Sequence, residues 1–123
     1  MTSTRLAPCP SSPNCVSSDA PEAAHAVAAL ALAVPAADAW HAVRAAVGRL
    51  PRATIVEDGP GYLRAECRSR LFRFVDDLEL ELRAADGIVA VRSAARIGRH
   101  DLGVNRRRVE RLRAALRAEG IVR

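Results

Sequence analysis

The fold is decided by the stretch Ile-Val-Ala-Val-Arg-Ser-Ala-Ala-Arg-Ile at residues 88–97. Its side chains alternate between two faces, and one face consists of Val89, Val91, Ser93 and Ala95. Such alternation predicts a β-strand with one apolar face. The loop Gly-Arg-His-Asp-Leu-Gly at 98–103 follows, and then an arginine-rich amphipathic segment up to Leu116. We therefore expect a strand, a loop and a helix in this order, with the residues best suited to chemistry gathered in the loop.

Three stretches upstream of it also predict strands, namely residues 53–57, 62–68 and 72–83. In the second and third of these, apolar side chains alternate with charged ones. Asp-Gly-Pro-Gly at 58–61 and Ala-Ala-Asp-Gly at 84–87 are turn signals between consecutive strands. Together with 88–97, these stretches predict an antiparallel meander of four strands that has one apolar and one charged face.

Two amphipathic segments, 35–48 and 103–118, predict helices that cover the apolar face. The first has apolar residues at helical spacing, namely Trp40, Val43, Val47 and Leu50. The second has Val109, Leu112 and Leu116. Residues 27–34 alternate from Leu30 onward and predict an edge strand. The expected fold is therefore α+β, a two-layer sandwich in which an antiparallel four-stranded meander is covered on one face by two helices.

Residues 1–24 are rich in Ser, Pro and Asn and follow neither a helical nor a strand period, so they predict an extended N-terminal arm. Leu6 and Val16 indicate that this arm packs on residues 25–123, which we expect to form a single α+β domain. No apolar targeting or membrane segment is visible in the sequence, whose longest apolar run is the alanine-rich 26–37. These features predict a cytoplasmic location.

The 19 basic residues are all arginine, and the formal net charge is +5. Arginine presents a planar fork of donors that suits carboxylates and phosphates, which favours an anionic small molecule or protein partner. The alternative is that alanine and arginine are abundant because of coding bias in a GC-rich genome. Aromatic residues make up only 3% of the chain, which argues against nucleic acid as a partner because bases have almost no stacking platform. The composition leaves the oligomeric state open.

One carboxylate breaks the strand alternation, because Asp76 falls on the apolar side of its strand. A lone carboxylate in an apolar environment is costly unless it is paired. We therefore expect Asp76 to be a structural residue with a cationic partner. A functional carboxylate is one alternative, and a β-bulge at Asp76-Asp77 that shifts the alternation is another.

The cysteines offer three interpretations. Cys9 and Cys15 flank a proline-containing loop, and their spacing is wider than the Cys-x-x-Cys of redox or zinc sites. In a reducing cytoplasm we expect both of these thiols to be free, as well as Cys67 on the apolar strand face. A disulfide or thiol switch formed by Cys9 and Cys15 is an alternative, and a metal site that adds His25 is the third. In the first interpretation, in which the thiols are free, we expect the protein to bind no metal ion and no cofactor.

The turn at 96–108 is the main candidate site. A helix start surrounded by arginines has free N–H donors and positive charge, which suits a carboxylate or phosphate. The candidate ligand-binding residues are Arg96, His100, Asp101, Asn105 and Arg106. In the structural alternative, Asp101 caps the helix and the arginines pair with the acidic strand face or point into water. In a third interpretation, His100 and Asp101 are the acid–base pair of an enzyme.

Four motifs occur in collinear order: Cys-Pro-Ser-Ser-Pro-Asn-Cys-Val-Ser-Ser at 9–18, Ser-Arg-Leu-Phe-Arg-Phe-Val-Asp-Asp at 69–77, Arg-Ser-Ala-Ala-Arg-Ile-Gly at 92–98 and Asp-Leu-Gly-Val-Asn-Arg-Arg-Arg-Val-Glu at 101–110. In these motifs the chain resembles a bacterial and plastid family catalogued as domain of unknown function 1499 (DUF1499). The resemblance implies no particular activity, and the sequence has no P-loop, Rossmann fingerprint, nucleophile elbow or His-Glu-x-x-His. We therefore predict a non-catalytic binding or assembly module with an anion-binding turn at 96–108. The alternative is a small enzyme, or a thiol-redox or metal protein.

Overall fold

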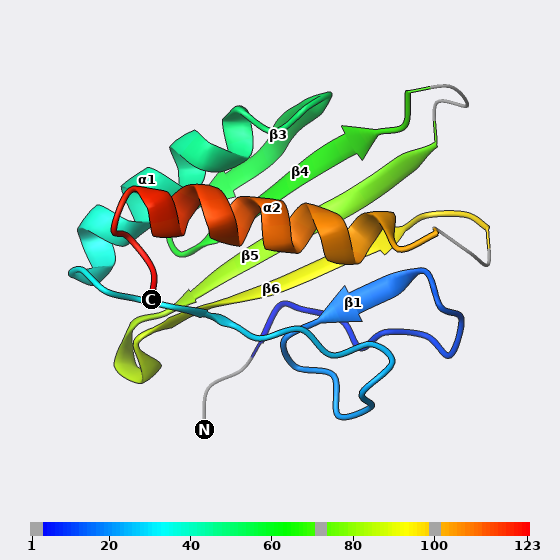
Figure 1. Ribbon diagram of the computed structural model, residues 1–123, viewed down its shortest axis with the longest axis horizontal. Coiled ribbons are helices and arrows are strands. Elements are labelled where there is room, and N and C mark those ends of the chain that lie inside the picture. The colour runs from blue at the N-terminus through cyan, green and yellow to red at the C-terminus, as the bar shows by residue number, and fades with distance from the viewer. Residues whose placement is uncertain (1–3, 71–73, 99–101) are drawn as a thin grey trace.

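The computed structural model describes residues 4–70, 74–98 and 102–123, which form a twisted sheet and two helices (Figure 1). The sheet contains β1 Cys15–Ser17, β2 Leu30–Ala31, β3 Ala53–Gly59, β4 Tyr62–Arg68, β5 Val75–Arg83 and β6 Ile88–Ala95. The helices are α1 Ala36–Gly48 and α2 Val104–Ala118, and a short 3-10 turn, η1 Ala84–Asp86, precedes β6. The expected α+β class is confirmed.

The strands lie in the order β1-β6-β5-β4-β3, each neighbouring pair is antiparallel, and β2 also pairs with β6. Strands β3 to β6 are the predicted meander. Besides the four strands of the meander, the sheet contains β2, which lies in the predicted edge segment, and β1, an additional strand from the N-terminal arm. Alternation could not reveal β1, since three residues are too few to establish a period of two.

The ends of the strands differ from the prediction in two places. Strand β3 continues to Gly59, so that Pro60-Gly61 alone forms the turn to β4. Within β3 the register shifts between Ile55 and Glu57, which makes Val56 a bulged residue on this edge strand. Strand β5 begins at Val75 rather than at residue 72, and residues 71–73 lie outside the described part of the chain.

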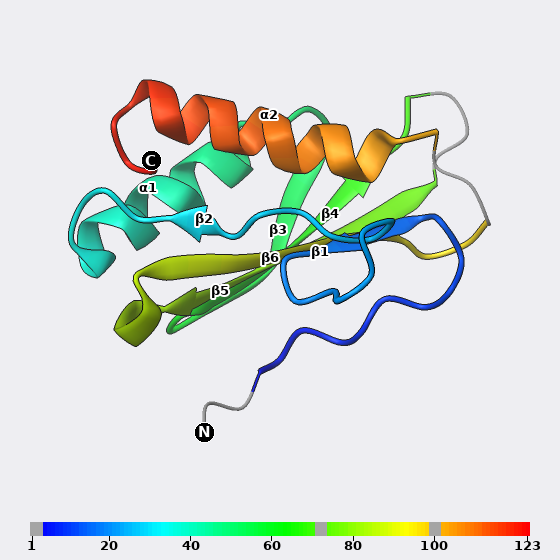
Figure 2. The ribbon, with the colours of Figure 1, turned by 60° about the horizontal axis from the view of Figure 1, so that its bottom comes forward.

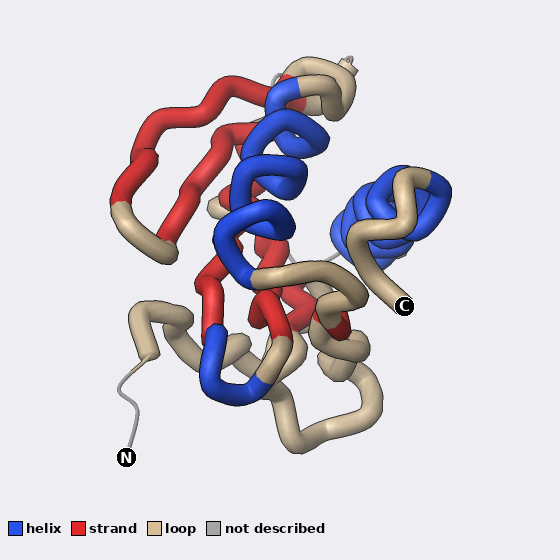
Figure 3. The backbone as a smooth tube through the Cα atoms, turned by 90° about the vertical axis from the view of Figure 1, so that its left-hand side faces the viewer, coloured by secondary structure: helices blue, strands red, loops and turns tan. Residues whose placement is uncertain are grey.

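Both helices pack on the same face of the sheet and enclose the core (Figure 2). Figure 3 looks almost along the axis of α2, whereas α1 lies across the view, so the two helices cross. The core residues that are completely buried include Val43, Val47, Leu63, Leu78, Leu80, Val91, Val109, Leu112 and Leu116. Each such side chain contributes about 1.5–3 kcal/mol when it is buried, so the helices and the sheet stabilise each other.

The N-terminal arm lies against the sheet, as Leu6 and Val16 predicted; both side chains are buried. Cys15 to Ser17 pair with β6, and the backbone N–H of Arg5 donates to Glu81 at 2.8 Å. The guanidinium of Arg5 also lies 3.8 Å from the centroid of the Tyr62 ring. These contacts extend over most of the described arm, which therefore has a defined conformation from residue 5 onward.

The face of the sheet opposite the helices is charged and paired within itself. Arg64 on β4 donates to Asp77 on β5 at 2.9 Å, and Arg96, just after β6, donates to the same carboxylate at 2.8 Å. The hydrogen bond from Arg96 is the main reason why the pKa of Asp77 lies below its ordinary value. This face therefore forms the cross-strand ion pairs that the sequence pattern indicated.

Asp76 lies on the helix-covered face and is buried. Its carboxylate forms an ion pair with Arg108 of α2, with 2.9 Å between the nitrogen and oxygen atoms. The prediction of a partnered structural carboxylate is confirmed. This ion pair joins α2 to β5. Both of its side chains are at least four-fifths shielded from solvent.

Candidate anion-binding site

A cavity of about 650 Å³ opens between the first half of α2 and the segment that joins α1 to β3. Its lining consists of Leu50, Pro51, Arg52, Arg68, Val104, Arg107, Arg108, Glu110 and Arg111. We call it the arginine cavity. Its volume is in the range of small-molecule sites, which is roughly 300–1,000 Å³.

Part of the charge in the arginine cavity is already paired. Arg108 binds Asp76, as described above, and Arg68 donates to Glu66 at 3.3 Å. Glu110, the single acid in the described lining, accepts two hydrogen bonds from Arg113 at 2.8 and 3.2 Å. Arg113 thereby holds the pKa of Glu110 below its ordinary value, so Glu110 stays ionised and engaged.

The other three arginines of the cavity have no carboxylate partner within residues 4–70, 74–98 and 102–123. Arg52 donates from Nε to the Arg68 carbonyl at 3.1 Å, and Arg107 donates to the Leu102 carbonyl at 2.8 Å. Arg111 donates neither to a carboxylate nor to a carbonyl group of any described residue. Arginine has five N–H donors, so most donors of these three groups remain available to a ligand.

The backbone around the cavity is strained at two positions. Arg52 and Leu102 have φ angles of 54° and 55°, and they are the only non-glycine residues with positive φ in the described chain. The Arg68 N–H donates to the Arg52 carbonyl at 3.1 Å and helps to hold this conformation. Gly103 has a φ of 77°, and a Cβ there would lie 2.9 Å from the Arg107 guanidinium. Strained backbone of this kind occurs often at functional sites.

Three of the predicted ligand-binding residues, Arg96, Asn105 and Arg106, are described, and none of them lines this cavity. Arg96 lies on the opposite, charged face, where Asp77 and Glu66 occupy its guanidinium. Arg106 donates to the carbonyls of Ala26 and Ala24 at 2.7 and 3.1 Å and so binds the chain before β2. His100 and Asp101 lie outside the described residues, so the predicted acid–base pair is not described either.

Asn105 is completely buried beneath the first turn of α2. Its side-chain oxygen accepts hydrogen bonds from the Ser93 hydroxyl at 2.6 Å and from Arg108 at 2.8 Å. Its side-chain nitrogen donates to the Asn14 carbonyl at 3.3 Å. Asn105 therefore connects the arm, β6 and a wall of the arginine cavity.

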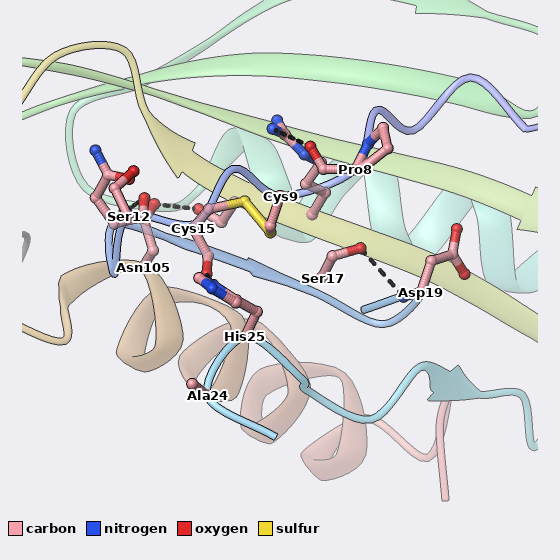
Figure 4. The surroundings of a disulfide bond; sticks show 12 residues. Pro8, Cys9, Ser12, Cys15, Ser17, Asp19, Ala24, His25 and Asn105 are labelled. Carbon is pink, nitrogen blue, oxygen red and sulfur yellow. Dashed lines mark hydrogen bonds between the residues drawn. A yellow bond between two sulfur atoms is a disulfide. The ribbon is translucent and has the colours of Figure 1, made fainter. Parts of the chain in front are cut away.

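The structure joins Cys9 and Cys15 in a disulfide with a Cα–Cα distance of 5.7 Å (Figure 4). The prediction that these thiols are free is therefore wrong. That prediction assumed a reducing cytoplasm, whereas disulfides persist in oxidising compartments. The spacing of the cysteines could not decide the question, because two prolines and the pairing of β1 with β6 bring the sulfur atoms together.

The disulfide also bears on the metal alternative. His25 is buried, and its Nδ1 lies 2.9 Å from the Cys15 carbonyl oxygen (Figure 4). With the two sulfur atoms bonded to each other, neither is a thiolate ligand. Among the described residues, no group of three or more His, Cys, Asp or Glu side chains is arranged to hold a metal ion. Cys67 is a free, buried thiol whose pKa is raised by burial, as expected for a core residue.

Sequence reasoning missed Arg52, Arg68 and Arg111 as members of a common site. Arg107 and Arg111 are one helical turn apart, which is a signal for a shared helix face. No sequence signal connects them with Arg52, because the left-handed backbone at that position is visible only in the structure. No helix in the described ranges combines the length and hydropathy needed to cross a membrane.

The family model described as "Protein of unknown function (DUF1499)" matches residues 5–116. The chain belongs to this family, as the four collinear motifs indicated. Comparison with curated proteins and with solved structures found no match. The family description assigns no activity, so the function has to be inferred from the site itself.

Proposed function

We propose that this DUF1499 protein is a non-catalytic binding module that holds an anionic ligand in the arginine cavity. One observation carries the proposal: Arg52, Arg107 and Arg111 line one cavity, and none of them meets a carboxylate in the described chain. Like charges gathered without counterions repel each other, and an anion bound between them relieves this repulsion. Guanidinium forks also match phosphate and carboxylate geometry.

The proposed site differs from the predicted turn at 96–108. Arg107 and Arg108 belong to both, and the N-terminal half of α2 supplies Arg111 in addition. Arg96 and Arg106 are not part of the proposed site, because protein acceptors already occupy their guanidinium groups. The site therefore lies on the helix side of the sheet, between α2 and the start of β3.

The lining supports binding rather than catalysis. Its described side chains include no Ser, Cys, His or Tyr that could act as a nucleophile or an acid–base group. Glu110 is the one titratable acid among them, and Arg113 keeps it ionised and hydrogen-bonded. What the cavity offers is preorganised positive charge, since carbonyl groups orient Arg52 and Arg107 without neutralising them.

Titration with inorganic phosphate tests the proposal, with isothermal calorimetry and the melting temperature as measurements. We expect saturable binding that weakens as salt is added. Arg111→Ala should weaken it by roughly ten- to a hundred-fold, because one charge-assisted hydrogen bond contributes about 1.5–3 kcal/mol. Arg117→Ala is the matched control on the same helix, since Arg117 binds the Arg123 carbonyl away from the cavity.

Arg52→Gly separates binding from stability. Glycine adopts a positive φ without strain, so this variant should keep its melting temperature while it loses phosphate affinity. If phosphate neither binds the parent protein nor raises its melting temperature, the arginine cavity is not an anion site.

A further inference from the structure

We propose that the ligand of the arginine cavity is an amphiphile, with an anionic head between the arginines and a hydrocarbon chain against an exposed apolar end of the molecule. This inference rests on the proposed function and adds the chemical class of the ligand. It is carried by the apolar part of the cavity lining and by the exposed apolar residues beside it.

The cavity lining has two kinds of surface. Arg52, Arg107 and Arg111 provide the charge, whereas the remaining unpaired surface is apolar and comes from Leu50, Pro51 and Val104. No aromatic and no uncharged polar side chain is present in the described lining. Such a site has nothing to stack on a nucleobase and no neutral partner for sugar hydroxyl groups. Its chemistry matches a charged group attached directly to an aliphatic one.

The first turn of α2 lies beside the end of the sheet where β5 begins and β6 ends (Figure 1). Asp76 pairs with Ala95, and the Arg96 N–H donates to the Val75 carbonyl at 3.1 Å. Phe74 and Ile97 lie at this end of the sheet, one residue before β5 begins and two residues after β6 ends.

Phe74, Ile97 and Leu102 are exposed because α2 begins at the end of the sheet. Phe74 is 49% exposed, Ile97 63% and Leu102 86%, and the Leu102 carbonyl accepts a hydrogen bond from Arg107 of the cavity at 2.8 Å. Among the described residues, three acids at this end, Glu66, Asp76 and Asp77, are bound to arginines. Exposed large apolar side chains that gather at one end of a protein often mark interaction sites. Beside unneutralised arginines, it complements a ligand that is apolar at one end and negative at the other.

A series of alkyl phosphates below their micelle-forming concentrations tests the inference by calorimetry, with inorganic phosphate as the reference. We expect affinity to rise from methyl to butyl to hexyl phosphate, by about two- to fourfold for each methylene group that becomes buried. Ile97→Asn should reduce this gain and leave inorganic phosphate binding unchanged, because Ile97 is exposed and lies outside the cavity lining. Arg111→Ala should weaken the binding of every member of the series.

Four results would overturn the inference. If phosphate binds but hexyl phosphate binds no more tightly, the ligand is a simple anion and the proposed function stands alone. If neither binds, the proposed function fails as well. If hexyl maltoside binds as tightly as hexyl phosphate, or Arg111→Ala leaves hexyl phosphate binding intact, the apolar end binds detergents without regard to charge.

The source of the amphiphile is tested with vesicles of phosphatidylcholine that do or do not contain phosphatidic acid. Co-sedimentation with the anionic vesicles, lost in Ile97→Asn and in Arg111→Ala, supports a bilayer lipid as the ligand. Binding of hexyl phosphate without co-sedimentation supports a free amphiphile. Both results support the same ligand chemistry.

Discussion

Reduction of the Cys9–Cys15 disulfide should destabilise the protein by a measurable amount. The two cysteines are six positions apart. For so small a closed loop, the loop-entropy relation gives a loss of about 2–2.5 kcal/mol in the free energy of unfolding. For a domain of this size, that corresponds to a fall of roughly 7–12 °C in the melting temperature.

The assay is thermal unfolding followed by circular dichroism, with and without a dithiol reductant. The double variant Cys9→Ala and Cys15→Ala is the matched control, because the reductant has no disulfide to reduce in it. We expect the reductant to lower the melting temperature of the parent and to leave that of the double variant unchanged. Thiol titration of denatured, unreduced protein should detect Cys67 alone.

Two results would refute this reasoning. Three reactive thiols in protein prepared without reductant would mean that the disulfide does not form. A parent that has one reactive thiol, but whose melting temperature does not respond to reduction, would mean that the arm is held by its other contacts. The pairing of β1 with β6 and the buried Leu6 side chain would then be sufficient.

Two further predictions concern carboxylates. Asp76→Ala should lower the free energy of unfolding by about 3–5 kcal/mol, because it leaves the Arg108 guanidinium buried without its counterion. Urea unfolding measures this loss, and Asp86→Ala, which removes an exposed carboxylate on η1, is the control. Asp77 has a lowered pKa, so its ion pairs stabilise the protein fully above about pH 4, and this contribution is lost as the pH falls through the lowered value. In acid unfolding curves, Asp77→Asn should therefore be less stable than the parent near neutral pH, and the difference should shrink toward low pH; a constant difference would contradict the linkage.

The architecture could be predicted because it depends on periods within short segments. Alternation at 62–68 and 88–97 assigned one face of each strand to the core, and the stripe at Val109, Leu112 and Leu116 assigned one face of α2. All three of these α2 residues are completely buried. Asp76 could be predicted in the same way, since a carboxylate on an apolar face needs a partner, although the sequence did not indicate that the partner is Arg108.

The candidate site could be predicted only in part: Arg107 and Arg108 lie in the predicted turn, but the sequence does not show which of the many arginines find a carboxylate. Arg96 seemed available beside its loop, yet the strand register places it next to Asp77 and Glu66. Arg52 and Arg111 are far apart in the sequence and line one cavity only because α2 packs beside the start of β3. Likewise, the thiols of Cys9 and Cys15 meet because the arm folds onto β6. Side-chain period is a local property of the chain, whereas charge pairing and disulfide formation depend on distances that exist only after the chain has folded.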